Sequence, residues 1–188
     1  MHTGLPPSPW VQRFAGLLQP GGAVLDVACG GGRHLRWLAG QGYAVTGVDR
    51  DEAALASLRG LAELIVADIE GGPWPLPGRR FDGIVVTNYL WRPLVPQLLE
   101  ALGPGGVLIW ETFAAGHETI GKPSRPDFLL QPGELLRLCA GLRVVAFEDG
   151  FEGGGQGMTP RYVQRIAALR APGGAVTAPR YRLDAPGR

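Results

Sequence analysis

The sequence predicts an α/β fold in which a mostly parallel sheet is covered by helices on both faces. Short apolar runs alternate with amphipathic stretches along the 188 residues, and most of the links between them are short. Parallel neighbouring strands need crossover connections, which are usually helices, so this alternation indicates repeated βα units. Hydrophobic residues make up 45% of the chain, which suits one domain with a single core.

The first elements are defined by a helix cap and by glycine and proline stops. A helix is predicted over residues 8–19, with Ser8 at its N-cap and Pro9 in its first turn. The apolar run 23–27 is the first strand, and a glycine-rich turn separates it from a helix over 33–39. The chain therefore opens with a helix and then a βα unit.

The later elements repeat this pattern. A second strand over 44–48 ends at Asp49, a helix follows over 52–59, and a third strand over 64–67 ends at Asp68. The remaining predictions are a strand over 81–87, a helix over 94–102, a turn over 103–106, a strand over 107–112, a helix over 133–140 and strands over 142–147 and 161–169. The last two strands are joined without a helix, which predicts an antiparallel hairpin at one edge.

Charge and composition exclude several classes of partner. Residues 171–188 carry three Arg and one Asp, a net charge of +2, which leaves −1 on residues 1–170 of a chain whose total is +1. Nucleic-acid binders gather positive charge on the folded domain, so we expect no nucleic-acid partner.

The N-terminus lacks the pattern of a signal peptide and no apolar run is long enough for a membrane span, so we expect a cytoplasmic protein. Two Cys and three His in no zinc-like spacing predict no metal.

The end of the first strand carries the most informative chemistry. Ligands of open α/β sheets bind beyond the carboxyl ends of the strands, and here the glycines Gly30 to Gly32 allow close approach to the backbone. Asp26 lies just before this turn, where its carboxylate repels a pyrophosphate and attracts a cationic group. The third glycine of a dinucleotide fingerprint is also missing, because Leu35 stands there. The pattern favours a cationic ligand over NAD.

Two further acids end the next two strands. Asp49 can accept hydrogen bonds from a ribose diol, and Asp68 can accept one from an adenine amino group while Ile69 packs on the ring. Each acid alone can also be a helix cap or a turn residue. Together, three acids at three successive strand ends fit one adenosine that carries a cationic tail.

These motifs resemble those of the class I S-adenosylmethionine-dependent methyltransferases, over residues 8–170. The first motif of that family corresponds to Asp26 through Gly32, with Ala28 where the family commonly has Gly. The resemblance implies a three-layer, Rossmann-like methyltransferase fold with a seven-stranded sheet in the order 3-2-1-4-5-7-6 and strand 7 antiparallel. It also implies S-adenosylmethionine as cofactor and S-adenosylhomocysteine as product.

The same resemblance assigns roles to residues. Asp26 and the backbone of 28–32 would hold the methionyl end, Asp49 the ribose, and Asp68 with Ile69 the adenine, while Asn88 and Tyr89 would border the departing methyl. The cofactor-binding set that it implies is Asp26, Ala28, Cys29, Gly30, Gly32, Asp49, Arg50, Asp68, Ile69 and Asn88. Cys29 has no nucleophilic role in the family.

The C-terminal pattern is similar to the TehB-like, tellurite-resistance branch of the family. This pattern comprises residues 128–135, 142–145 and 165–167. The best-known member of that branch methylates small oxyanions. The resemblance therefore implies a small-molecule methyl acceptor, whose identity and whose reacting atom the sequence does not indicate.

Methyl transfer from a sulfonium needs alignment more than a side-chain nucleophile. A hydroxyl or amine acceptor would also need a base, and the candidates are Tyr89, Glu111 and His117. His117 lies in the segment 113–130, which lacks periodicity and which we expect to be a lid, although a solvated loop histidine is the alternative. Aromatic side chains that could wall an acceptor pocket, or equally pack in the core, are Trp10, Tyr89, Trp91, Phe113 and Phe128.

We expect one methyltransferase domain over residues 1–170, with an N-terminal helix within 1–20, and a Gly- and Pro-containing tail over 171–188. The favoured function is methylation of a small molecule. One alternative is an RNA or protein methyltransferase, which Arg33, Arg36 and the basic tail would favour. Another is a module that binds S-adenosylmethionine without catalysis. The oligomeric state is not indicated by the sequence.

Overall fold

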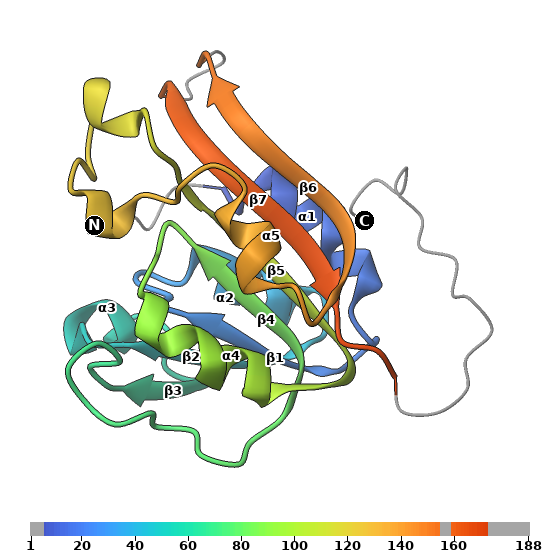
Figure 1. The fold of residues 1–188 in the computed structure, drawn as a ribbon. Helices are drawn as coiled ribbons and strands as arrows, with labels where there is room; N and C mark the ends of the chain where they lie inside the picture. The colour runs from blue at the N-terminus through green and yellow to red at the C-terminus, as the bar shows by residue number, and fades with distance from the viewer. Residues whose placement is uncertain (1–5, 155–158, 173–188) are drawn as a thin grey trace.

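The computed structural model describes residues 6–154 and 159–172. Within these residues one mixed sheet runs in the order β3-β2-β1-β4-β5-β7-β6 (Figure 1). The strands are β1 (Ala23–Val27), β2 (Ala44–Asp49), β3 (Glu63–Val66), β4 (Phe81–Thr87), β5 (Leu102–Phe113), β6 (Arg143–Glu152) and β7 (Arg161–Leu169). Strand β7 is antiparallel to both β5 and β6, while β1 to β5 are parallel. The predicted strand order and the antiparallel hairpin are confirmed.

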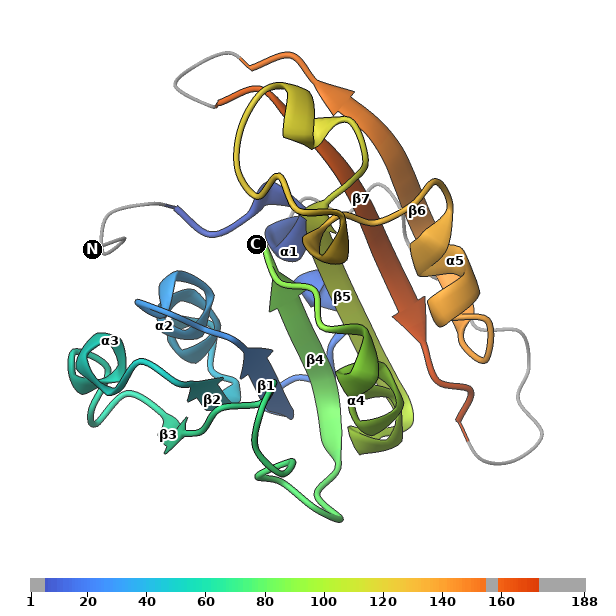
Figure 2. The ribbon, with the colours of Figure 1, turned by 60° about the vertical axis from the view of Figure 1, so that its left-hand side comes forward.

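Helices cover both faces of the sheet and make three layers (Figures 1 and 2). The α-helices are α1 (Pro9–Phe14), α2 (Arg33–Gly40), α3 (Glu52–Ala56), α4 (Val95–Ala101) and α5 (Glu134–Leu138). Short 3-10 turns are η1 (Ala15–Leu17), η2 (Arg92–Leu94), η3 (His117–Thr119) and η4 (Pro126–Phe128). Helices α4 and α5 pack on one face, and α1, α2 and α3 pack on the other.

Each face of the sheet has its own hydrophobic core. Ile84 and Val86 of β4 join the core beneath α4 and α5, whereas Val85 between them joins the core beneath α1 and α2. Successive strand residues point to opposite faces, so a strand buried on both sides is apolar throughout. This explains why the central strands were visible as continuous apolar runs.

Some predicted boundaries are wrong for local reasons. The first helix was predicted over 8–19 but is α-helical only to Phe14, after which η1 contains Gly16, a residue with low helix propensity. The predicted turn 103–106 belongs instead to β5, because the Gly105 N–H donates to the Arg170 carbonyl and the Arg170 N–H donates to Gly106. Backbone pairing with the end of β7 thus extends β5 backwards.

Strand β6 is longer than the predicted 142–147. It continues to Glu152 because its ladder with β7 runs on to the pair Glu152 and Arg161. Conversely, α3 ends at Ala56 rather than at Arg59. Most of the predicted tail 171–188 lies outside the described residues.

Candidate active site

The carboxyl ends of β1, β2, β4 and β5 meet at one edge of the sheet (Figure 2). The chain reverses direction across the sheet between β1 and β4, since β1 is followed by β2 on one side and β4 lies on the other. Such a switch point is where open α/β sheets bind ligands. The strand register brings Asp26 beside Val85, and Thr87 beside Glu111, at this edge.

The turn after β1 has a backbone that glycine favours. Ala28, Gly30 and Gly32 all have positive φ, at 51°, 50° and 71°. A Cβ at Gly32 would come within 2.4 Å of the Leu58 side chain and would strain the backbone at this positive φ, so glycine is favoured there. The Gly30 N–H donates to Asp49 Oδ2, with an N···O distance of 2.7 Å. The end of β2 therefore holds the glycine turn in place.

Asp26 is a buried acid with an unused oxygen. Its side chain is 1% exposed, and Oδ2 has no hydrogen-bond partner among the described residues. Burial raises the pKa of Asp26 to about 7, against the opposing effects of the Leu35 backbone N–H and the Arg33 guanidinium. A cation placed against this carboxylate would restore its ordinary ionisation.

A hollow of about 160 Å³ lies beside the glycine turn. It is lined by Ala28, Asp49, Arg50, Ala67, Asp68, Ile69, Glu70 and Tyr89. The structure thus brings five of the ten predicted cofactor residues to one cavity. Asp68 Oδ1 accepts hydrogen bonds from the backbone N–H groups of Glu70 and Gly71, which lower the Asp68 pKa. Asp68 is therefore an anionic acceptor beside the cavity.

The other predicted cofactor residues lie on β1, on the turn that follows it and at the end of β4. Asp26, Gly30 and Gly32 belong to β1 and its turn, and Asn88 is exposed at the end of β4 with a φ of 54°. Cys29 is buried, and burial followed by the charge of Asp26 raises the pKa of its thiol. A nucleophilic role for Cys29 is thereby disfavoured, in agreement with the resemblance.

Glu111 is tied into a network of ion pairs. Its side chain is 1% exposed and contacts Arg165 Nε, while Arg161 Nη2 lies 3.4 Å away and Ser8 Oγ donates to it at 3.0 Å. Arg165 also contacts Glu148 and Glu152, so each of its three guanidinium nitrogens faces a carboxylate. Both carboxylate oxygens of Glu111 already accept from these donors, which argues against Glu111 as the proton acceptor.

Tyr89 lies in the hollow that the acids line, on the cofactor side. Its hydroxyl is buried in this hollow, beside the Glu70 carboxylate. Burial, and then the nearby Glu70 carboxylate, raise the pKa of the phenol. Tyr89 is therefore a neutral hydrogen-bond donor near neutral pH rather than a phenolate base.

His117 is buried, in contrast to the solvated alternative. Its side chain is 4% exposed and stacks on Phe113 with ring centroids 4.4 Å apart. Nε2 lies 3.1 Å from the Lys122 carbonyl oxygen, which can only accept, so Nε2 carries the hydrogen. Nδ1 then presents a lone pair, and it has no partner in the described part of the chain.

The aromatic candidates do not form one wall. Trp10 is 4% exposed in the core beneath α1, where its indole N–H donates to the Ile166 carbonyl. Trp91 packs against the opposite core. Phe113 and Phe128 lie in the segment 113–130, at its base and near its end, and are half-buried. These two remain beside the β5 end.

The segment 113–130 is closed at its base. The Leu130 N–H donates to the Phe113 carbonyl, and the Ala115 N–H donates to the Leu130 carbonyl. Arg92, which sequence reasoning missed, donates to the carbonyls of Asp127 and Leu129 and to the Glu134 carboxylate. Arg92 follows β4 by five residues, and only folding reveals that it reaches this segment.

A second missed group links α2 to β4. The Ser8 backbone N–H donates to His34 Nε2 at 3.1 Å, and His34 Nδ1 lies 3.3 Å from Thr87 Oγ1. His34 is 2% exposed. A lone histidine on a helix gave no signal in the sequence, because its partners lie 26 and 53 residues away.

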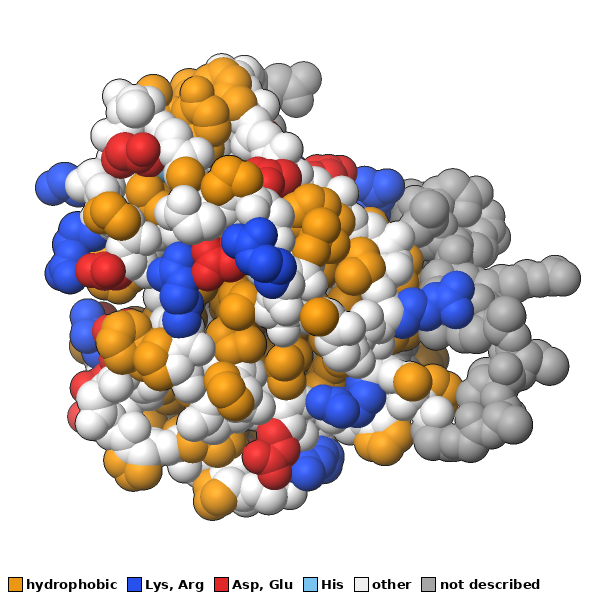
Figure 3. All heavy atoms as spheres, in the orientation of Figure 1, with side chains coloured by type: hydrophobic (Ala, Val, Ile, Leu, Met, Phe, Trp, Pro, Cys, Tyr) orange, Lys and Arg blue, Asp and Glu red, His pale blue; other side chains and the backbone are white. Residues whose placement is uncertain are grey.

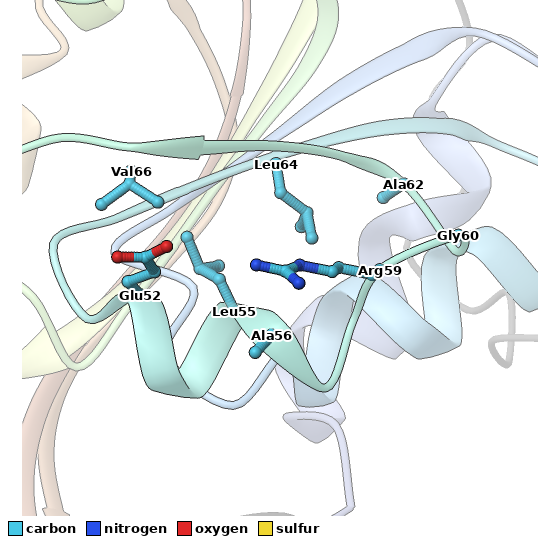
Figure 4. A pocket seen from close by; sticks show the side chains of 8 residues that line it. All are labelled: Glu52, Leu55, Ala56, Arg59, Gly60, Ala62, Leu64 and Val66. Atoms are coloured by element: carbon cyan, nitrogen blue, oxygen red, sulfur yellow. The ribbon is translucent and has the colours of Figure 1, made fainter.

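A larger hollow, of about 330 Å³, lies away from the strand ends (Figure 4). It is formed by α3 and the edge strand β3, with Arg59 and Glu52 beside apolar side chains. It contains none of the predicted site residues. We therefore place the active site at the smaller cavity, where the acids and the glycine turn meet.

The two arginines that favoured RNA do not form a patch. Arg33 is half-buried near Asp26 and Glu111, whereas Arg36 donates to the backbone carbonyl and hydroxyl of Ser57. On the face shown in Figure 3, basic side chains are scattered among acidic and hydrophobic ones.

In the described ranges, no cluster of three or more metal-ligating His, Cys, Asp or Glu side chains occurs. No helix there is long and apolar enough to cross a membrane.

Comparison with known proteins finds a matching domain family and similar folds. Residues 24–106 match the family described as "Methyltransferase domain". The structure of TehB from Haemophilus influenzae is similar, with a TM-score of 0.70 at 21% identity over 85% of this chain. The match spans 61% of the TehB chain, less than two thirds of its length.

Two further structures share the fold. A TehB-like S-adenosylmethionine-dependent methyltransferase from Corynebacterium glutamicum has a TM-score of 0.64 at 21% identity, covering 89% of this chain and 90% of that one. The glycopeptide N-methyltransferase MtfA, complexed with S-adenosyl-L-homocysteine, has a TM-score of 0.61 at 18% identity, covering 89% and 91%. None of the curated proteins matches the sequence.

Proposed function

We propose that this chain, a class I S-adenosylmethionine-dependent methyltransferase, transfers the methyl group to a small-molecule acceptor held beyond the ends of β4 and β5. The observation that carries the proposal is the anchored segment 113–130, which stands beyond these strand ends (Figure 2). Arg92 ties this segment to the chain that follows β4. A site bounded in this way suits a small acceptor.

The residues present fit the cofactor. Asp26 Oδ2 is a buried carboxylate oxygen without a partner, as expected of a group that faces the methionyl ammonium. We assign Asp49 to the ribose hydroxyls, and Asp68 with Ile69 to the adenine. When bound, S-adenosylmethionine supplies a methyl group already activated on a sulfonium.

The chain's own work is alignment, exclusion of water and, for some acceptors, removal of a proton. A thiolate or a chalcogen oxyanion needs no base, whereas a hydroxyl or amine acceptor does. Of the three candidates, His117 is favoured, because its Nδ1 lone pair is unused while Glu111 is neutralised by arginines and Tyr89 keeps its proton. We assign the role of proton acceptor to His117 Nδ1.

A methyl-transfer assay with labelled cofactor tests this function across thiol, phenol, amine, selenite and tellurite acceptors, with RNA as a further acceptor. We expect transfer to at least one small molecule and little transfer to RNA. His117→Gln should slow transfer to a phenol or amine and leave transfer to a thiol nearly unchanged. Label on RNA alone would overturn the small-molecule assignment, and binding of S-adenosylhomocysteine without transfer to any acceptor would indicate a non-catalytic module.

A further inference from the structure

The ring of His34 has a defined tautomer. The Ser8 backbone N–H can only donate, so His34 Nε2 accepts from it at 3.1 Å and carries no hydrogen. Burial, and then the charge of Arg33, lower the pKa of His34 to about 3, which keeps the ring neutral. The single ring hydrogen of a neutral imidazole must then be on Nδ1.

This tautomer sets the direction of the next hydrogen bond. Nδ1–H donates to Thr87 Oγ1, which lies 3.3 Å away. A hydroxyl that accepts still has its own hydrogen to donate, and Thr87 Oγ1 has no other partner within the described ranges. Glu111, which is paired with Thr87 on the adjacent strand, already accepts a hydrogen bond from Ser8 Oγ and forms ion pairs with two arginines. The Thr87 hydrogen is therefore available to a ligand.

Thr87 also lies in the right place. It is the last residue of β4, at the switch point between β1 and β4, and its side chain is half-buried. Its face of the sheet is the one that α2 covers, because Val85, two residues before it, packs in that core. It is followed by Asn88 and then by Tyr89, which lines the cofactor hollow.

We propose that the Thr87 hydroxyl donates a hydrogen bond to an oxygen lone pair of a bound ligand, with His34 as the positioning residue that directs it. This inference rests on the proposed function, since the oxygen belongs either to the methyl acceptor or to the methionyl carboxylate of the cofactor. In the first case the site selects acceptors that carry a hydrogen-bond-accepting oxygen beside the reacting atom. An acceptor without such an oxygen leaves the donor unpaired.

Three variants test the donor. Thr87→Val removes the hydroxyl and keeps the shape, Thr87→Ser keeps the hydroxyl, and Thr112→Val is a matched control on the adjacent strand, one residue after Glu111 and so on the opposite face. S-adenosylhomocysteine binding is measured by calorimetry, and kcat and KM are measured for the acceptor from the panel that wild type methylates fastest. We expect Thr87→Val to change one of these quantities by about tenfold, and Thr87→Ser and Thr112→Val to change neither by more than about threefold.

Whether Thr87→Val changes S-adenosylhomocysteine binding or the acceptor kinetics identifies the source of the oxygen. Weaker S-adenosylhomocysteine binding points to the methionyl carboxylate, and a raised acceptor KM with unchanged S-adenosylhomocysteine binding points to the acceptor. Unchanged values in both arms overturn the proposal. If wild type methylates no acceptor, the proposed function fails, and the calorimetric arm alone then decides on Thr87.

A spectroscopic readout separates this role from simple packing. The ¹⁵N shifts of His34 should show a protonated Nδ1 and an unprotonated Nε2, unchanged in Thr112→Val. His34→Gln should reproduce the functional loss of Thr87→Val, and the double variant should lose no more than either single one. A hydrogen on Nε2, or additive losses in the double variant, would sink the directed-donor inference.

Discussion

Asp26→Asn should favour the folded, cofactor-free protein more at pH 8 than at pH 5, while weakening cofactor binding. The pKa of Asp26 is raised by burial from 3.8 to about 7, so between these values the folded state holds a proton that the unfolded chain releases. The free energy of unfolding therefore falls as pH rises from about 4 to about 7 and is level above that. From pH 5 to pH 7 the loss is about 3 kcal/mol, at about 1.4 kcal/mol per pH unit.

Asn at position 26 carries no charge and removes this loss. Its amide is also buried, but that cost is the same at both pH values and cancels in the comparison. For a domain of this size, 1 kcal/mol shifts the melting temperature by about 2 °C. The melting temperature of the variant minus that of wild type should therefore be about 6 °C higher at pH 8 than at pH 5. The affinity for S-adenosylhomocysteine should fall by about 1.5 to 3 kcal/mol, through loss of the charge that we propose to face the ammonium.

Melting curves at pH 5 and pH 8, with calorimetry at pH 8, measure both effects. Asp127→Asn, which makes the same change at a side chain that is 64% exposed, is the control. Binding of S-adenosylhomocysteine at pH 6.5 should also release a proton, seen in buffers of different ionisation enthalpy. If Asp26→Asn is destabilised relative to wild type as much at pH 8 as at pH 5, or more, the inference that burial disfavours the ionised Asp26 carboxylate is refuted.

Three other variants probe the site and its loop. Asp49→Ala should weaken S-adenosylhomocysteine binding by about 1.5 to 3 kcal/mol in calorimetry, since it also frees the Gly30 N–H; unchanged affinity would make Asp49 only a turn residue. Arg92→Gln should lower the free energy of unfolding, measured in urea, by about 1 to 3 kcal/mol and should speed hydrogen exchange in 126–130, because two carbonyls and Glu134 lose their donor. The control is Arg125→Gln, at an exposed side chain, which should lower the free energy of unfolding by under about 1 kcal/mol. Shortening the segment between Ala115 and Arg125 should keep S-adenosylhomocysteine affinity within a few fold and abolish transfer; loss of cofactor binding would place the segment in the cofactor site.

Local sequence was sufficient for the fold class. The alternation of apolar runs and amphipathic stretches predicts an α/β sheet, because buried parallel strands must be apolar and their crossovers helical. The acids Asp26, Asp49 and Asp68 were recognisable for a similar reason, since residues that follow parallel strands gather at one edge. The strand order came from the family resemblance, and the structure confirms it.

Tertiary structure decided the protonation and pairing of the groups at that edge. Glu111 is a candidate base in the sequence, and its ion pairs with Arg161 and Arg165, 50 and 54 residues away, form only in the folded chain. Thr87 has no distinguishing neighbour in sequence, and His34, which contacts its hydroxyl, lies on α2 and is 53 residues away. Burial and long-range contacts determine which atoms hold protons, and neither is encoded in local periodicity.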